Sequence, residues 1–504
     1  MEGSRIKAAG DNESILALRK PGDEVINLEG RLLVPGFSDS HIHILMTCDQ
    51  DKQLRLHGVK SGEEILKRAQ SYIADRCPGP EEWIIGTGFD QSAFAIPRMP
   101  DRRLADRISC SNPVILFRVC YHVAVVNSVA LTRLDLKNAG KGVEYDENGE
   151  PTGVFIENSV DYLLGIAPPS REEIERKILK MADRMLRAGI TAAHSLDTGE
   201  KSNAGNIITV YRSLAKTGRL PLRVNQGIAV DSVESLEKIL QWPEWNDPLP
   251  FFKLGFIKVI GDGSLGARTA LLREPYADDP QTRGVANFTQ EEIDKLAAIC
   301  HRAGRQIAFH AIGDAMLERV LRAVEKLDNP QKLRHRVIHC MIGDDAQYRR
   351  IAKLGLCADI HPFFLIFYFS MNTRLGENRA ATAYAWKSLY DLGIPLAGGS
   401  DSPVAPFNPL EAIYWAVTRQ TPGGYPDGGF HPEQRLGVAE ALGIYTAGAA
   451  YLAFDEHQRG TVEPGKLADF TVLTKNILRV DPGEILDTGV YQTWVNGELV
   501  YQQG

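Results

Sequence analysis

Most of the chain after residue 170 alternates amphipathic helical segments with short apolar strands, and glycine often separates the two. In residues 171–189 apolar side chains recur at helical spacing as far as Gly189, and the strand-like stretch "ITAAHSLD" follows directly. Apolar positions spaced by three and four predict a helix, and a glycine behind them predicts its end. The same pattern returns in residues 291–314, 315–342, 345–364 and 381–403.

Further strand-like stretches at residues 32–44, 222–230 and 254–264 bring the predicted strands of this kind to about eight. Eight strands that alternate with helices predict an α/β protein whose parallel strands close into a TIM-type (β/α)8 barrel. Such a barrel builds its active site at the carboxyl ends of the strands. The residues that end each predicted strand are therefore the first candidates for function.

Ionisable side chains end most of these strands: His41, His43, His194, Lys258, Asp262, His310, Asp314, His339, His361 and Asp401. A single histidine at a strand end is more often bonded to a loop carbonyl than to a metal. Repetition at equivalent positions favours a shared site instead. His41 and His43 occupy alternate positions of one strand and face the same side, which is a chelating arrangement.

These residue types predict metal-dependent hydrolysis. Imidazole and carboxylate groups bind zinc and similar divalent ions, and two such ions can activate a water molecule and polarise a carbonyl. Lys258 is unusual in this set because an ammonium group would be repelled by the ions unless it lost its proton or changed chemically. A salt bridge with Asp262 and Schiff-base chemistry are the alternatives for Lys258.

A chain of 504 residues is longer than one ordinary core requires. Residues 51–165 interrupt the barrel pattern and predict an inserted α/β subdomain near the active-site mouth. Residues 1–34 and 440–504 carry short strand patterns with turns and predict a small β-sandwich built from both termini. The barrel itself is expected in residues 35–50 and 166–439.

Composition narrows the class of partner. A net charge of -7 gives no general attraction to nucleic acid or to an anionic membrane, and the longest apolar run, residues 362–369, is too short to cross a bilayer. We expect a small-molecule substrate, with neither nucleic acid nor membrane as partner. The polar start of the chain lacks a signal peptide and predicts a cytoplasmic location. A homodimer is left open as the commonest assembly.

Six motifs in order resemble the amidohydrolase superfamily, specifically its YtcJ-like (amidohydrolase 3) branch. They are "LVPGFSDSHIHI", "FIKVIGDGSLGARTALL", "IAFHAIGD", "HRVIHC", "PLAGGSDSPV" and "GTVEPGKLADFTVL". The resemblance implies a binuclear centre of two divalent ions, with zinc the expected metal. His41, His43 and Asp401 would bind one ion, His310 and His339 the other, and Lys258, carboxylated by CO2, would bridge the two.

The reaction implied by this resemblance is hydrolysis of an amide-type C–N bond, with N-substituted amides or formamides as substrates. A metal-bridging hydroxide would attack the carbonyl, and Asp401 would carry the proton to the leaving nitrogen. His122 matches a position on the inserted subdomain and is expected to contact the substrate or the oxyanion, although packing within the subdomain is an equal alternative. Arg268, His361 and Phe89 are further candidates for substrate binding, and His194 has either a supporting or a structural role.

Two other functions fit the same fold. A deaminase of the superfamily commonly uses one metal and lacks the bridging lysine, so Lys258 argues against that alternative. A catalytically silent binding or regulatory protein would be expected to have lost a metal ligand, whereas all six ligand positions are filled here.

Overall fold

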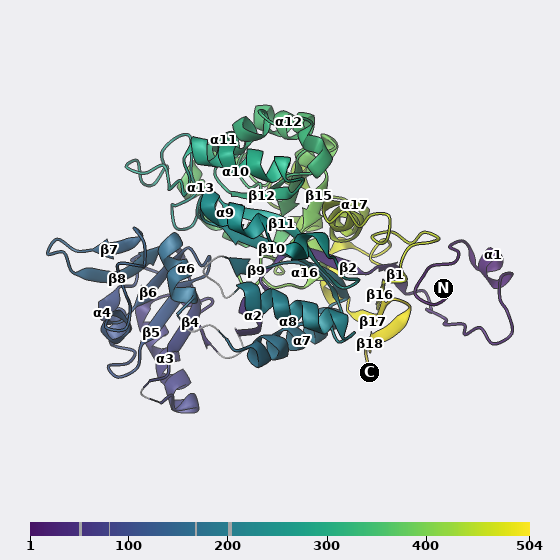
Figure 1. Ribbon diagram of the computed structural model, residues 1–504, viewed down its shortest axis with the longest axis horizontal. Helices are drawn as coiled ribbons and strands as arrows, with labels where there is room; N and C mark the ends of the chain where they lie inside the picture. Colours follow the sequence, from purple (N-terminus) through teal and green to yellow (C-terminus); the bar gives the residue numbers. More distant parts are fainter. Residues whose placement is uncertain (50–52, 80, 167–168, 200–203) are drawn as a thin grey trace.

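The computed structural model describes residues 1–49, 53–79, 81–166, 169–199 and 204–504, and three β-sheets organise this part of the chain (Figure 1). The predicted barrel is confirmed at the centre of the molecule, where eight parallel strands pair in chain order. These strands are β2 (Phe37–Ile42), β9 (Ile190–Gly199), β10 (Arg223–Val230), β11 (Phe252–Ile260), β12 (Gln306–Ala311), β13 (Arg336–His339), β14 (Cys357–Ile360) and β15 (Leu396–Gly398).

The first and last barrel strands meet along a seam at their carboxyl ends. The Asp401 amide donates to the carbonyl oxygen of His41 at 2.7 Å, and the His43 amide donates to that of Ser402 at 2.9 Å. The Ser400 amide also donates to a carboxylate oxygen of Asp39, at 3.1 Å. These bonds close the barrel and bring two segments some 360 residues apart into one place.

Helices surround the barrel, and helix α7 illustrates why they form. Ser170 caps α7 by accepting a hydrogen bond from the Glu173 amide, and Gly189 ends the turn behind it with a φ of +77°. The apolar residues of the predicted periodicity are buried on its inner face. The helices are α2 (Ile44–Asp49), α7 (Arg171–Arg187), α8 (Ala204–Lys216), α9 (Val233–Leu240), α10 (Gln290–Arg302), α11 (Asp314–Val324), α12 (Asp345–Leu354), α15 (Trp386–Asp391) and α16 (Pro409–Thr418).

Between α2 and α7 the chain forms a separate lobe, at the left of Figure 1, around a mixed six-stranded sheet. Apolar side chains pack on both faces of this sheet, Leu116 and Val125 on one and Ile115 and Phe117 on the other. The lobe contains β3 (Leu54–Arg55), α3 (Gly62–Arg76), β4 (Ile84–Phe89), α4 (Arg102–Asp106), β5 (Val114–Arg118), β6 (Val123–Val126), α5 (Ser128–Leu131), β7 (Val143–Tyr145), β8 (Pro151–Ile156) and α6 (Asn158–Leu164).

Both ends of the chain contribute to a third, antiparallel sheet of β1 (Leu32–Pro35), β16 (Phe470–Leu473), β17 (Val490–Val495) and β18 (Glu498–Gln502). The Ile6 amide adds the N-terminal segment by donating to the Lys466 carbonyl at 2.8 Å. The sheet rests on the end of α7, where the Thr493 hydroxyl donates to the Leu186 carbonyl at 2.7 Å.

None of the helices in the described part of the chain is both long and apolar enough to cross a membrane.

Candidate metal centre

The barrel seam brings His41, His43 and Asp401 together. One carboxylate oxygen of Asp401 lies 3.3 Å from His41 Nε2 and 3.2 Å from His43 Nε2. His43 is oriented from its other side, since its Nδ1 donates to the Leu196 carbonyl at 2.8 Å. Asp401 has a φ of +55°, a conformation that costs energy for an L-residue and is typical of functional positions.

Burial and hydrogen bonding set the protonation states of Asp401 and the histidines around it. Burial alone would raise the pKa of the Asp401 carboxyl, but its hydrogen bonds to His41 and His43 outweigh burial and hold that pKa well below the usual range. Burial lowers the pKa values of His41, His310 and His339 well below that of free imidazole. The centre therefore presents an ionised carboxylate and three neutral imidazoles, which are the protonation states that bind divalent metal ions. Burial also opposes the imidazolium of His43, but its hydrogen bond to Asp401 outweighs burial and raises the pKa of His43.

Lys258 reaches the same centre from β11. Its side chain is buried, and Nζ lies 3.5 Å from His41 Nε2. Burial lowers the pKa of the Lys258 amine to about 7, because an ammonium ion is costly away from water. Asp262, the salt-bridge alternative, accepts instead from His310 Nδ1 at 2.9 Å and from the Gly313 amide at 2.8 Å.

His310 and His339 complete the cluster from β12 and β13. Their ring centroids are 4.4 Å apart, and the hydrogen bond to Asp262 fixes the orientation of His310. Ligand atoms of His41, His339 and Asp401 lie within 4.8 Å of one another, which is close enough for metal binding. The six predicted ligands thus come from the carboxyl ends of five barrel strands.

His122 enters the centre from the inserted lobe. It lies in the turn between β5 and β6, and its ring centroid is 5.3 Å from that of His310. Its Nδ1 donates to Glu157 Oε2 at 2.7 Å. Burial disfavours the imidazolium, but the Glu157 carboxylate outweighs it and raises the pKa of His122 to about 10. A cationic imidazole held in this way is suited to binding a carbonyl oxygen.

The other nominated residues lie in different surroundings. His361 is beside the cluster, 4.6 Å from the His339 ring, and its Nδ1 donates to the Gly399 carbonyl. His194 is buried beneath the centre and accepts a hydrogen bond from Arg336 at 3.4 Å. Arg268 forms an ion pair with Asp278 at 3.0 Å, and Phe89 is buried within the apolar core of the inserted lobe.

Glu157, Arg118 and Cys120 also lie at the site, although they were not predicted from the sequence. The Arg118 guanidinium donates to Cys120 Sγ at 3.0 Å, and both residues lie in the wall facing the metal centre. All three belong to the inserted lobe, outside the barrel pattern, so no strand-end position pointed to them. Only the folded arrangement brings the lobe against the barrel mouth.

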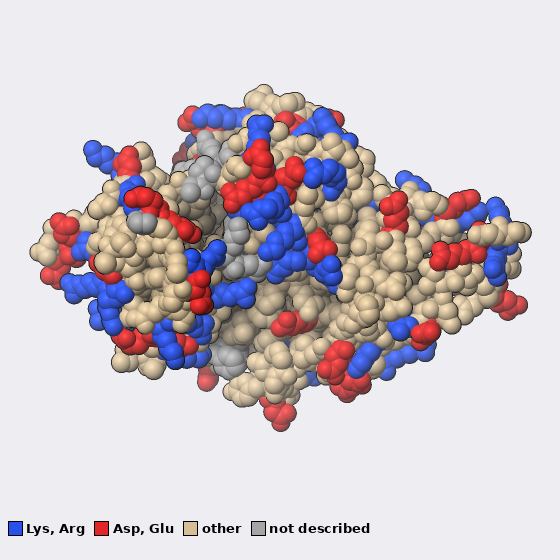
Figure 2. Space-filling model, turned by 90° about the horizontal axis from the view of Figure 1, so that it is seen from below, with Lys and Arg blue, Asp and Glu red and all other residues tan. Residues whose placement is uncertain are grey.

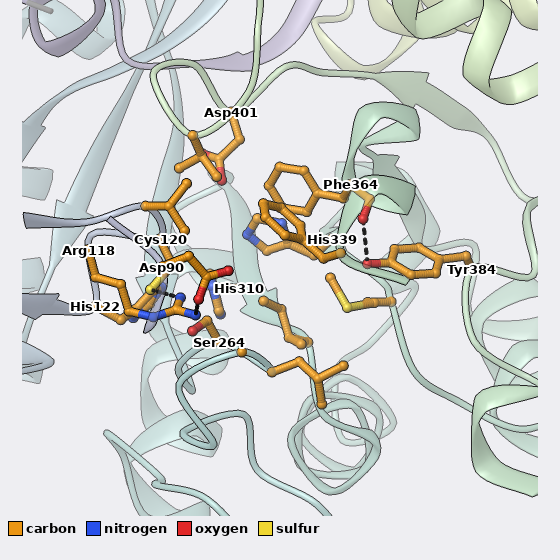
Figure 3. A pocket seen from close by; sticks show the side chains of 17 residues that line it. Asp90, Arg118, Cys120, His122, Ser264, His310, His339, Phe364, Tyr384 and Asp401 are labelled. Carbon is orange, nitrogen blue, oxygen red and sulfur yellow. Dashed lines mark hydrogen bonds and ion pairs between the residues drawn. The ribbon is translucent and has the colours of Figure 1, made fainter. Parts of the chain in front are cut away.

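Two cavities meet at the cluster. The smaller, of about 570 Å³, lies between Arg118 and Asp90 on one side and Phe364 and Tyr384 on the other, with His310, His339 and Asp401 between them (Figure 3). The larger, of about 2360 Å³ including its opening to solvent, extends between the inserted lobe and the barrel. A carbonyl group bound at the cluster would have one of its substituents in the smaller cavity and the other in the larger cavity.

The sequence of the chain is similar to those of known amidohydrolases. A family model described as "Amidohydrolase family" matches residues 24–501. The YtcJ protein of Bacillus subtilis, itself placed among amidohydrolases by name, is 34% identical over 100% of this chain and 95% of its own length. The N-substituted formamide deformylase of Arthrobacter pascens is 24% identical over 100% of this chain and 94% of its own.

Among solved structures, an uncharacterised metal-dependent hydrolase from Pyrococcus horikoshii superposes with a TM-score of 0.75 at 28% identity, covering 96% of this chain and 94% of that one. The barrel, the terminal sheet and the inserted lobe are thus shared with a metal-dependent hydrolase over nearly the full length. Together with the family model, this shows that the chain belongs to the amidohydrolase family.

Proposed function

We propose that this protein hydrolyses an amide-type C–N bond in a small molecule, with N-substituted amides of the formamide kind as its substrates. The observation that carries the proposal is the group of ligand atoms from His41, His339 and Asp401 within 4.8 Å of one another, beside the buried amine of Lys258. Charged side chains of both signs are interspersed over the face in Figure 2, which favours a small molecule over a polyanion.

The imidazole and carboxylate groups of the centre support the proposal of two divalent ions, with zinc the expected metal. His41, His43 and Asp401 would hold one ion, and His310 and His339 the other. With its pKa near 7, Lys258 is partly a free amine at neutral pH, the form that reacts with CO2 to give an anionic carbamate. Lys258 in that form would be an oxygen ligand shared by both ions.

When bound, such ions would activate a water molecule and polarise the substrate carbonyl. Asp401 would accept the proton of the attacking water. The position of its carboxylate beside His41 and its lowered pKa support this role. The same carboxyl group would then deliver that proton to the leaving nitrogen. His122, held by Glu157, would donate a hydrogen bond to the carbonyl oxygen as negative charge develops there.

The test combines metal content with catalysis. Elemental mass spectrometry of the purified protein is expected to give about two zinc-like ions per chain, with formate released from N-substituted formamides. Lys258→Ala should lose metal and activity, whereas Lys238→Ala, on an exposed helix face, should lose neither. One ion or none, unchanged in Lys258→Ala, would contradict the binuclear centre, and ammonia release from an amino-substituted ring would then favour the deaminase alternative.

A further inference from the structure

The metal centre lies where the two cavities touch. Both cavities are lined by Cys120, His122, His310, His339, Asp401 and Val404. A carbonyl bound there must direct its acyl side into one cavity and its nitrogen side into the other. The shapes and linings of the two cavities therefore define the two halves of the substrate.

The larger cavity has one wall from the sheet of the inserted lobe. Ile85 of β4 pairs in register with Ile115 of β5, and Phe117 follows on the same face. Trp83 and Leu163 extend this apolar wall. Because the residues alternate along each strand, a complete row of apolar side chains faces the barrel mouth.

The barrel supplies the facing wall, again from apolar side chains. Met46 follows β2, Leu196 lies in β9, Val230 ends β10 and Ile260 ends β11. With its opening to solvent included, this cavity measures about 2360 Å³, against about 570 Å³ for the smaller one by the same measure. Its size and lining suit an extended apolar group better than a compact polar one.

Outside the metal centre, the charged side chains in the larger cavity already have partners within the protein. Asp197 accepts from the Leu45 amide at 2.9 Å, from the Ser195 hydroxyl at 2.6 Å and from the Tyr211 hydroxyl at 2.8 Å. Glu157 is paired with His122, and Lys177 and Asp231 also interact within the chain. Among the described residues these groups are committed to the fold, so the cavity gains most from an uncharged occupant.

The smaller cavity is bounded by fixed groups. Arg118 is tied to Asp90 at 2.6 Å and to Cys120, and the Tyr384 hydroxyl donates to the Phe364 carbonyl at 3.1 Å. These bonds hold the walls on both sides of the metal centre (Figure 3). Since this cavity is about 570 Å³ against about 2360 Å³ for the larger one, it suits the smaller of the two substituents.

We infer that the larger cavity binds an extended, uncharged alkyl or aryl group on the nitrogen of the substrate, while the smaller cavity holds a compact acyl group such as formyl. This inference rests on the proposed function for its orientation, because the proposed substrate carries its bulk on nitrogen. It adds to the proposed function the character of the substituent on nitrogen, which is long, apolar and uncharged.

The first measurement uses the zinc-loaded wild-type protein and N-alkylformamides from N-ethyl to N-octyl. Burial of each methylene is expected to raise kcat/KM about two- to fourfold until the chain fills the cavity. The isomers N-octylformamide and N-methyloctanamide give the orientation, and the formamide should be the better substrate by at least about tenfold. A flat series, or a preference for N-methyloctanamide, would overturn the inference.

A binding measurement separates this inference from the proposed reaction. The uncharged fluorophore N-phenyl-1-naphthylamine should bind the larger cavity with enhanced emission, and longer N-alkylformamides should displace it at lower concentration. Such displacement without formate release would support the cavity assignment and defeat the proposed hydrolysis. Formate release that does not depend on the length of the alkyl chain would support the proposed hydrolysis and overturn the cavity assignment.

Matched variants locate the binding. Leu164 lines the larger cavity with 42% of its surface exposed, so Leu164→Asp introduces a charge there at little risk to folding. It should weaken fluorophore binding about tenfold and flatten the length series. Ile96→Asp places the same charge at an 80% exposed position of the same lobe that lines neither cavity, and should change neither result. Equal effects of the two variants, at equal melting temperature, would overturn the assignment.

Discussion

Asp401 has two roles in the proposed reaction, as a metal ligand and as the group that moves the proton. Asp401→Asn keeps the shape and one oxygen but removes the basic carboxylate. We expect formate release to fall about 10²- to 10⁴-fold, the usual contribution of a proton-transferring group, while most of the metal is retained. Formate assays together with elemental mass spectrometry check this. Full activity in Asp401→Asn would exclude the proton-transfer role.

His122 and Glu157 predict a pH dependence. Burial lowers the pKa of His122 and Glu157 raises it to about 10, so the protonated form persists through neutral pH. In Glu157→Gln burial remains without the compensating charge, so the pKa of His122 falls and the imidazolium is lost at lower pH. The alkaline limb of the kcat/KM profile should therefore shift to lower pH, by about one unit or more.

The control is Glu147→Gln, at an exposed position of the same lobe, which should leave the profile unchanged. Protonation of His122 also stabilises the folded protein, because its pKa is higher in the folded than in the unfolded state. This stabilisation is complete below the unfolded pKa of about 6.5 and disappears as the pH rises towards about 10. An alkaline limb that stays in place in Glu157→Gln would show that His122 does not act as a cation in the reaction.

The end of helix α7 is where the barrel meets the terminal sheet. Gly189 has a φ of +77°, and a Cβ there would lie 2.5 Å from Thr471 Cγ2. Gly218, behind α8, has a φ of +69° and open space around it. Gly189→Ala should lower the melting temperature clearly more than Gly218→Ala, which carries only the conformational cost of about 1 kcal/mol. Equal losses measured by calorimetry would mean that the Thr471 contact relaxes freely.

The elements of the barrel could be predicted from the sequence because each βα step is a local pattern. Helical spacing before Gly189 and the histidines at strand ends depend on residues near one another in the chain. Glu157 and Arg118 could not be found in this way, because their importance comes from the packing of the inserted lobe against strands more than a hundred residues away. Arg268 was nominated from a motif, whereas its ion pair with Asp278 depends on a loop geometry that the motif does not encode.

The inserted lobe and the barrel are joined by Arg374. Its guanidinium donates to the Ser92 hydroxyl of the lobe at 2.9 Å and to the Gly266 carbonyl of the barrel at 3.3 Å, and it pairs with Asp278. Arg374→Met removes these bonds, so the lobe that supplies His122 should be held less firmly. We expect faster proteolysis within residues 81–166 and a lower kcat/KM.

Arg379→Met is the matched control, because Arg379 also donates three hydrogen bonds, all to carbonyl groups outside the lobe. It should leave proteolysis of the lobe unchanged. If both variants were cleaved at the same rate, Arg374 would not be the link between the two parts.

The seam that joins β2 to β15 also sets an order of events during synthesis. His41 and His43 leave the ribosome among the first tenth of the chain, yet Asp401 and the backbone groups that close the barrel emerge some 360 residues later. At a translation rate of about 5–20 residues per second, the early histidines wait on the order of tens of seconds for their partner. A nascent or truncated chain therefore carries only part of the metal-ligand set. The complete site forms only after β15, the last strand of the barrel, and Asp401 behind it have been made.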